Sequence, residues 1–326
     1  MLNGKSILIT GGTGSFGKAF VKKALEEFNP RKIIVYSRDE FKQYQMSQTF
    51  TSDKLRFFIG DVRDEKRLYR ALTGVDLVIH AAAMKQVPAS EYNPFEAVQT
   101  NIMGAQNLIN AALEAGVQKV VALSTDKACN PVNLYGATKL CSDKLFIAAN
   151  AYSGKLITRF AVVRYGNVIG SRGSVVPLFQ KLAETGELPI TDERMTRFWI
   201  TLPQAVKFVV DSFNQMAGGE LYIPKIPSMR LTDLAQAIAP GCRYKIVGIR
   251  PGEKLHEMMI SRDDSRNLFE IPDRYIKLPD FPFWQVVLPA EAAAVSEGFE
   301  YSSDTNAQWL DVEGLRDLLK QKGVVE

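Results

Sequence analysis

The stretch Lys5-Ser-Ile-Leu-Ile-Thr-Gly-Gly-Thr-Gly-Ser-Phe-Gly17 predicts the fold of this chain more directly than any other part of the sequence. A short apolar run leads at once into glycines at positions 11, 14 and 17, and an amphipathic segment continues from 17 to 28. In this order Gly11 permits a tight turn, Gly14 lets a pyrophosphate approach the backbone, and Gly17 lets a helix pack closely on the strand. The phosphates of a dinucleotide then lie at the helix N-terminus.

The first half of the chain continues this alternation of strand and helix. Apolar runs at 33–36, 55–59, 77–79, 120–123 and 160–164 alternate with helical patterns such as 64–72, 95–115 and 134–151. Strands that crossover helices bury on both faces have this appearance. We therefore expect an α/β fold, a Rossmann-type doubly wound parallel sheet with a smaller, mixed α/β C-terminal lobe for the substrate. The predicted dinucleotide domain is 1–165, to which 202–226 returns, and the lobe comprises 166–201 and 227–326.

Composition excludes several classes of protein. The 326 residues carry a formal net charge of +4 with no concentrated basic stripe, so we expect no nucleic-acid partner. Three widely spaced cysteines and two histidines form no disulfide or metal pattern, so we expect no metal and a reducing, cytoplasmic environment. The chain starts directly in a strand and lacks an apolar run of about 18 residues, so neither a signal peptide nor membrane association is expected.

The end of the second strand indicates which dinucleotide binds. Ser37 and Arg38, a small donor and a cation, suit the 2′-phosphate of NADP. In the alternative interpretation, Arg38 only caps a surface turn and Asp39 binds the ribose. The predicted cofactor-binding residues are Gly11, Thr13, Gly14, Ser15, Phe16, Gly17, Ser37, Arg38, Asp39, Lys42, Asp61, Val62, Ala81, Ala82, Lys85, Tyr135, Lys139 and Val168.

A Tyr-x-x-x-Lys pair follows the fifth predicted strand. Tyr135 and Lys139 are four residues apart on a predicted helix and therefore share one face. A nearby ammonium and a cationic nicotinamide should lower the pKa of Tyr135, which makes it a base near neutral pH. Thr125, at the end of the strand, would hydrogen-bond the substrate oxygen. The same spacing is also common on solvated helix faces, and only its position after a dinucleotide fingerprint favours catalysis.

This constellation resembles the extended short-chain dehydrogenase/reductase superfamily, and further motifs narrow the resemblance. The segments that carry it are Thr13-Gly-Ser-Phe-Gly17, Ser37-Arg-Asp-Glu40, Gly60-Asp-Val-Arg-Asp64, His80-Ala-Ala-Ala-Met-Lys85, Ser124-Thr-Asp-Lys-Ala128 and Arg250-Pro-Gly-Glu-Lys-Leu-His256. Together they look like the inverting UDP-N-acetylglucosamine 4,6-dehydratases of pseudaminic acid biosynthesis, a pathway used to glycosylate flagellin. Relatives that retain the C5 configuration carry Met where Tyr135 stands, so the resemblance implies inversion at C5.

Asp126 and Lys127 distinguish a dehydratase from an enzyme that only oxidises a hydroxyl. Loss of water from C5 and C6 needs a base for the C5 proton and an acid for the C6 hydroxyl. We assign these roles to Lys127 and Asp126, so that the predicted catalytic residues are Thr125, Asp126, Lys127 and Tyr135. Lys127 must be neutral to act as a base, and burial beside Lys139 or the nicotinamide is expected to lower its pKa. The alternative for the pair is a surface ion pair.

The expected reaction converts UDP-N-acetylglucosamine to UDP-2-acetamido-2,6-dideoxy-beta-L-arabino-hex-4-ulose, with NADP regenerated in each cycle. By resemblance, the substrate-binding residues are Lys85, Thr125, Asn167, Arg172, Ser174, Val175, Arg250 and Glu253. The family also implies a homo-oligomer, a hexamer. Other hypotheses stay open: a UDP-hexose 4-epimerase, a C5-retaining or bifunctional dehydratase–epimerase, and a non-catalytic NADP-binding sensor.

Overall fold

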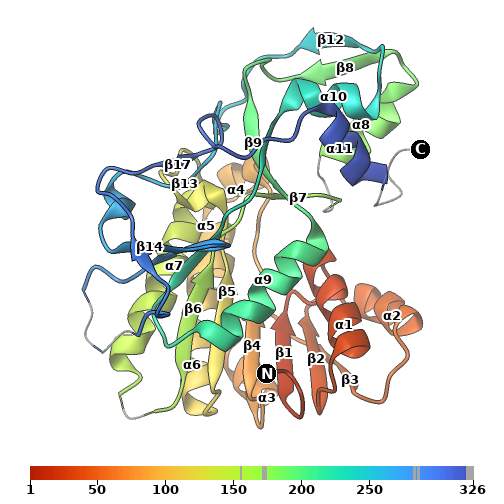
Figure 1. Cartoon of the computed structure of the whole chain (residues 1–326). Coiled ribbons are helices and arrows are strands. Elements are labelled where there is room, and N and C mark those ends of the chain that lie inside the picture. The colour runs from red at the N-terminus through yellow and green to blue at the C-terminus, as the bar shows by residue number, and fades with distance from the viewer. Residues whose placement is uncertain (155, 171–174, 282–283, 285–286, 321–326) are drawn as a thin grey trace.

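The computed structural model describes residues 1–154, 156–170, 175–281, 284 and 287–320. A ten-stranded sheet forms its base (Figure 1). The parallel part of the sheet consists of β1 (Ser6–Thr10), β2 (Lys32–Ser37), β3 (Leu55–Ile59), β4 (Leu77–His80), β5 (Lys119–Leu123), β6 (Arg159–Val163) and β10 (Leu221–Pro224). These strands are ordered β3-β2-β1-β4-β5-β6-β10, the doubly wound arrangement that the sequence predicts.

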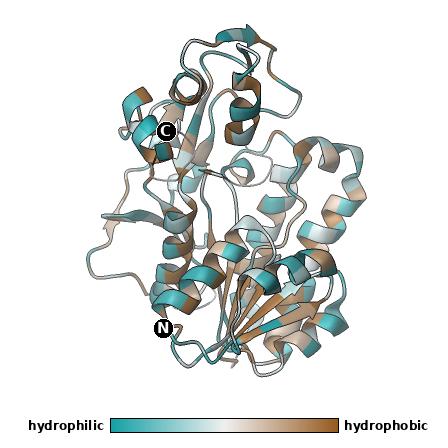
Figure 2. Cartoon of the chain, turned by 90° about the vertical axis from the view of Figure 1, so that its right-hand side faces the viewer, coloured by the Kyte–Doolittle hydropathy of each residue, from teal (hydrophilic) through white to brown (hydrophobic). Residues whose placement is uncertain are grey.

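Two groups of helices cover this sheet and close its apolar core. The first group consists of α1 (Ser15–Glu27), α2 (Glu40–Thr49) and α9 (Leu202–Gln215). The second consists of α3 (Glu65–Leu72), α6 (Gly104–Glu114) and α7 (Leu134–Tyr152). α1 packs against α9, and α6 packs against both α3 and α7. The strands between them are predominantly apolar, as their brown colour in Figure 2 shows, and β1 and β4 are buried along their whole length.

The large sheet extends further along the chain than predicted. β15 (Arg274–Lys277) pairs antiparallel with β10, and the next strands outward are β14 (Leu268–Ile271) and β16 (Ala293–Ala294). The sequence analysis placed this part of the chain in the lobe. The difference arises because short antiparallel edge strands among prolines lack the long apolar run that marks a buried parallel strand.

A smaller lobe lies above the carboxyl ends of the parallel strands (Figure 1). Its core is separate from that of the sheet and includes Phe179, Trp199, Leu234 and Leu315. The lobe contains β7 (Asn167–Val168), α8 (Val175–Ala183), β8 (Glu187–Ile190), β9 (Thr196–Ile200), β11 (Ser228–Arg230), α10 (Leu231–Ile238), β12 (Arg243–Ile246) and α11 (Val312–Lys320). Ligands of open α/β sheets bind at this edge, so the space between sheet and lobe is where a site is expected.

Short elements connect these parts and surround the space below the lobe. They are α4 (Val87–Tyr92), α5 (Pro94–Ala97), the π-helix η1 (Val98–Met103), the 3-10 helices η2 (Asp126–Ala128) and η3 (Asp263–Ser265), β13 (Met258–Ile260) and β17 (Tyr301–Ser302). No helix among the described residues is both long and apolar enough to span a membrane.

Candidate active site

The glycine turn between β1 and α1 forms a cradle that only glycine can build. Gly11 has a positive φ of 63°, and a Cβ on it would lie 2.9 Å from the backbone of Ala81. Gly14 is the N-cap of α1 and offers no side chain to the helix amides, which leaves them available to an anion. The cradle therefore fits the pyrophosphate of a dinucleotide.

Replacing Gly17 with alanine should destabilise the protein and weaken dinucleotide binding. A Cβ at this position would lie 2.1 Å from the carbonyl oxygen of Gly12, so the turn or the helix must shift. Overpacking of this kind costs about 1–3 kcal/mol. Calorimetry should show a Tm lowered by about 2–10 °C, and titration with the dinucleotide should show weaker binding. A variant with the Tm and affinity of the wild type would contradict the close packing seen here.

A cavity of about 1220 Å³ runs from this cradle to the lobe, which is room for more than one drug-sized ligand. Nearly all predicted site residues line it. From the cofactor set these are Gly11, Thr13, Gly14, Ser15, Phe16, Gly17, Ser37, Arg38, Lys42, Asp61, Val62, Ala81, Ala82, Lys85, Tyr135, Lys139 and Val168. From the remaining sets these are Thr125, Lys127, Asn167, Val175, Arg250 and Glu253. Arg172 and Ser174 lie outside the described residues.

Two predicted residues do not line the cavity. Asp39 is the N-cap of α2, where its carboxylate accepts from the backbone of Lys42 at 2.9 Å and pairs with the Lys42 ammonium. Asp126 is fully buried beneath the cavity wall. Asp39, predicted to contact the cofactor, is thus engaged in the fold, and Asp126, predicted as the catalytic acid, reaches the cavity only through its neighbours.

Tyr135 and Lys139 lie on α7, whose first turn is capped by Asn133 through a 2.7 Å bond from the Gly136 amide. Both side chains are buried. Burial raises the pKa of Tyr135 to about 12, although Lys127 and a hydrogen bond with Thr125 act in the opposite direction. Burial also lowers the pKa of Lys139, against the attraction of Asp143. The predicted lowering of the Tyr135 pKa is thus wrong for the protein without cofactor, because burial outweighs the nearby ammonium.

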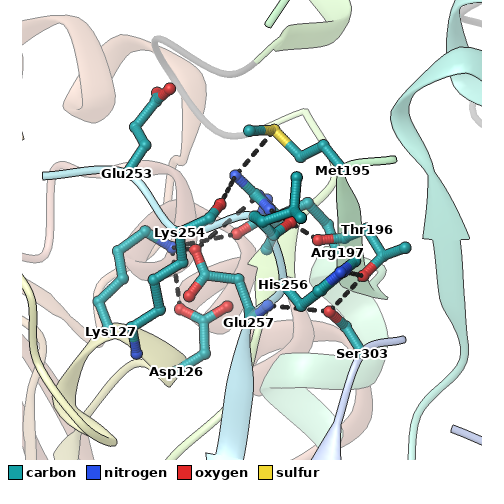
Figure 3. A network of polar contacts seen from close by, with 12 residues as sticks. Asp126, Lys127, Met195, Thr196, Arg197, Glu253, Lys254, His256, Glu257 and Ser303 are labelled. Atoms are coloured by element: carbon teal, nitrogen blue, oxygen red, sulfur yellow. Dashed lines mark hydrogen bonds and ion pairs between the residues drawn. The ribbon is translucent and has the colours of Figure 1, made fainter. Parts of the chain in front are cut away.

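Lys127 forms the centre of a charged cluster at the floor of the cavity (Figure 3). Its Nζ lies 2.9 Å from Asp126 Oδ1 and 3.3 Å from Glu257 Oε1. Burial disfavours the ammonium, but attraction to Asp126 and Glu257 outweighs that penalty and raises the pKa of Lys127. The predicted lowering of the Lys127 pKa is wrong, because attraction to Asp126, to which Glu257 adds, outweighs burial.

Thr125 connects this cluster with the tyrosine. Its hydroxyl lies 2.9 Å from Asp126 Oδ1, and it also bonds to Tyr135. Across the cavity, burial lowers the pKa of Lys85, and repulsion from Lys127 adds to the effect. The side chains of Thr125, Tyr135, Lys127 and Lys85 therefore face one volume, where a hydroxyl can be deprotonated and charge can be stabilised.

The segment 250–257 closes the far side of the site and docks on the catalytic residues. Asn133 Nδ2 donates to the carbonyl of Gly252 at 2.8 Å, and Lys254 Nζ donates to the carbonyl of Cys129 at 2.6 Å. Within the segment, Arg250 pairs with Glu253 at 2.5 Å. This loop carries His256, whose Nδ1 contacts Thr196 Oγ1 at 2.8 Å.

The sequence analysis also missed Asn101, which lies in the π-helix η1. Its side chain accepts from the Met84 amide at 2.8 Å and donates to the Met84 carbonyl and to Thr138 Oγ1, each at 3.0 Å. Asn101 thereby fixes the loop with Lys85 against α7. A π-helix has no distinctive sequence pattern, although its presence often marks a functional site.

A dinucleotide cradle, a buried Tyr-x-x-x-Lys pair and this strand order define an extended short-chain dehydrogenase/reductase. Residues 7–279 match the family model described as polysaccharide biosynthesis protein, and the chain belongs to that family. It is 60% identical, over 98% of both chains, to a UDP-N-acetylglucosamine 4,6-dehydratase (inverting) of Campylobacter jejuni subsp. jejuni serotype O:23/36 (strain 81-176). The resemblance predicted from the motifs is confirmed.

Solved structures give the same result for the fold. The crystal structure of Pen from Bacillus thuringiensis matches over 100% of both chains with a TM-score of 0.92 and 38% identity. DesIV, a dTDP-glucose 4,6-dehydratase from Streptomyces venezuelae solved with NAD and TYD bound, covers 77% of this chain and 86% of its own, with a TM-score of 0.69 and 26% identity. The predicted fold class, a Rossmann-type sheet with a C-terminal lobe, is therefore confirmed.

Proposed function

We propose that this chain is a UDP-N-acetylglucosamine 4,6-dehydratase that inverts C5. The observation that carries the proposal is the cluster of Thr125, Asp126 and Lys127 beside Tyr135 in one cavity. An epimerase needs the tyrosine and its lysine but no further acid and base. The identity over nearly the whole chain to the inverting dehydratase of Campylobacter jejuni supports the same substrate.

The residues present fit a nicotinamide dinucleotide, and we assign it as NADP. Thr13 Oγ1 and Ser37 Oγ are 3.0 Å apart at the end of β2, beside Arg38 and Lys42. The Asp39 carboxylate caps α2, so it is not available as the carboxylate ligand that an NAD ribose usually receives. DesIV was solved with NAD. A test therefore has to compare the binding of NADP, which carries the 2′-phosphate, with the binding of NAD.

Replacing Arg38 with alanine should weaken NADP binding about ten- to hundred-fold, the usual contribution of a charge-assisted hydrogen bond. NAD binding should change little, because NAD has no 2′-phosphate. Calorimetric titration of cofactor-stripped protein with both dinucleotides measures the difference. An equal loss for both would mean that Arg38 acts on the fold and not on the phosphate.

The site residues can divide the reaction between them. Tyr135 takes the C4 hydroxyl proton while Thr125 hydrogen-bonds the same oxygen, and the bound nicotinamide would accept the C4 hydride and return it to C6. The C4 ketone acidifies C5–H, and Lys127 removes that proton. We assign to Asp126 the proton for the departing C6 hydroxyl, and Thr125, whose hydroxyl donates to Asp126 Oδ1 at 2.9 Å, links this carboxyl group to the cavity.

Substrate binding involves the other end of the cavity. Arg250 and Glu253 lie in a turn held against α7, where a guanidinium can bind diphosphate oxygens in a bidentate manner and a carboxylate can bind a ribose. Lys85, Asn167 and Val175 line the path between this turn and the catalytic cluster. We therefore assign the UDP portion of the substrate to the lobe.

The cellular setting extends the same proposal. On its family resemblance we assign the chain to pseudaminic acid biosynthesis, in which its product would be the entry compound. The same resemblance leads us to propose that the protein acts in the cytoplasm and forms a homo-oligomer, a hexamer. The described cysteines Cys129, Cys141 and Cys242 are free thiols, as in a reducing environment. Among the described residues, no group of three or more His, Cys, Asp or Glu could hold a metal.

Mass spectrometry of the product tests the reaction class. Incubation with UDP-N-acetylglucosamine and NADP should give a sugar nucleotide lighter by one water. A product of unchanged mass with a new C4 configuration would contradict the dehydratase assignment and indicate the 4-epimerase.

A further inference from the structure

Glu257 is a buried carboxylate at the catalytic lysine, and neither the motifs nor the reaction scheme above includes it. It precedes β13 and is 2% exposed. Its Oε1 lies 3.3 Å from Lys127 Nζ, and its Oε2 has no hydrogen-bond partner among the described residues. Figure 3 shows the carboxylates of Glu257 and Asp126 side by side, both next to the ammonium of Lys127.

The surroundings of Glu257 hold it firmly in place. Its backbone amide donates to Ser303 Oγ at 2.9 Å. Arg197 Nε lies 3.8 Å from Oε1, and Arg197 also donates to the carbonyls of Leu255 and Lys254 at 3.0 and 3.1 Å. A carboxylate fixed this way, with one oxygen left without a partner, is costly for the fold unless it serves the site.

Lys127 must lose a proton before it can act as a base, and Glu257 lies close enough to accept that proton. Between two carboxylates Lys127 is an ammonium at rest, and an ammonium cannot accept the C5 proton. Its own proton must first pass to a neighbour. Asp126 is the group assigned to protonate the departing hydroxyl, which leaves Glu257 as the second carboxylate available to Lys127. The Oε2 atom of Glu257, like Oδ2 of Asp126, has no hydrogen-bond partner among the described residues and can accept a proton.

We propose that Glu257 is the proton acceptor for Lys127 during deprotonation of C5. One N–H bond of Lys127 breaks and an O–H bond forms on Glu257, while Lys127 forms a new N–H bond with the proton from C5. The C5–H electron pair remains on the substrate as the enolate of the C4 ketone. Lys127 is an ammonium before and after the step, and Glu257 returns its proton to solvent before the next cycle. Since Glu257 acts through Lys127, it is a positioning residue.

The inference rests on the proposed dehydratase reaction and is tested by Glu257→Gln, which keeps the side-chain shape but cannot accept a proton. We expect kcat for dehydration to fall about 100-fold or more, with KM for UDP-N-acetylglucosamine changed less than about three-fold. The first oxidation should persist, so that reduced-nicotinamide absorbance appears in a single turnover at the wild-type rate and then accumulates. Glu257→Asp, which retains an acceptor, should recover part of kcat.

Glu220→Gln is the matched control. Glu220 is also 2% exposed, and its carboxylate accepts from the amides of Ala217 and Gly218, away from the cavity. This variant should turn over at the wild-type rate. Dehydration by Glu257→Gln within about three-fold of wild type, or loss of C4 oxidation together with dehydration, would overturn the relay. Failure of the wild-type protein to release water would instead overturn the proposed function.

Discussion

Lys127→Ala should stop dehydration while leaving the first oxidation intact. Lys127 contacts Asp126 and Glu257, but oxidation at C4 requires only Tyr135, Thr125 and the cofactor in their places. A positioned general base typically contributes about 10²- to 10⁴-fold, so kcat for product should fall by that range. Stopped-flow absorbance should still show the reduced nicotinamide, and NMR should show no exchange of the C5 proton with solvent.

Lys127→Arg tests whether Lys127 acts as a base or only as a fixed positive charge. Arginine keeps the charge between the two carboxylates, but it stays protonated in proteins and cannot take the C5 proton. We therefore expect the arginine variant to be as deficient in dehydration as the alanine variant. Substantial turnover by Lys127→Arg would mean that Lys127 serves only as an electrostatic partner.

Tyr135→Phe should have an equally large effect on an earlier step. The substitution removes the hydroxyl that takes the C4 proton and retains the buried ring. Because oxidation at C4 precedes elimination, the variant should lose reduced-nicotinamide absorbance, C5 exchange and product together, by about 10²- to 10⁴-fold. Because burial raises the pKa of Tyr135 to about 12, a further positive charge such as that of the nicotinamide would be needed to favour the phenolate at neutral pH.

The two variants control for each other because they block different steps. Lys127→Ala should accumulate the oxidised sugar with reduced cofactor, and Tyr135→Phe should accumulate neither. If both lost the absorbance change equally, the division of labour between Tyr135 and Lys127 would be wrong, and the cluster would act as a single unit.

The parallel sheet and the catalytic helix could be predicted because their signals are local. The glycines after β1 and the spacing of Tyr135 and Lys139 are each readable within one short segment. The edge strands β14 and β15 were missed because their order in the sheet depends on pairing between distant segments. Nothing within residues 268–277 marks them as part of the large sheet.

The electrostatics of the site could not be predicted for the same reason. Glu257 and Lys127 meet only because the lobe folds over the sheet, and a single buried glutamate has no sequence signature. Burial alone would lower the pKa of Lys127, but attraction to Asp126, to which Glu257 adds, raises it. Likewise Asp39 resembles a ribose ligand in the sequence, and only its hydrogen bond to the Lys42 amide shows that it caps α2.

The most direct measurement for C5 inversion is NMR of the product formed in deuterated water. Incubation of the wild-type protein with UDP-N-acetylglucosamine should give a 4-keto-6-deoxy sugar nucleotide with L-arabino configuration and deuterium at C5. That result requires removal of the C5 proton and its replacement from the opposite face. A 4-epimer that retains its C6 hydroxyl, or a 4-keto product with C5 configuration unchanged, would contradict the account.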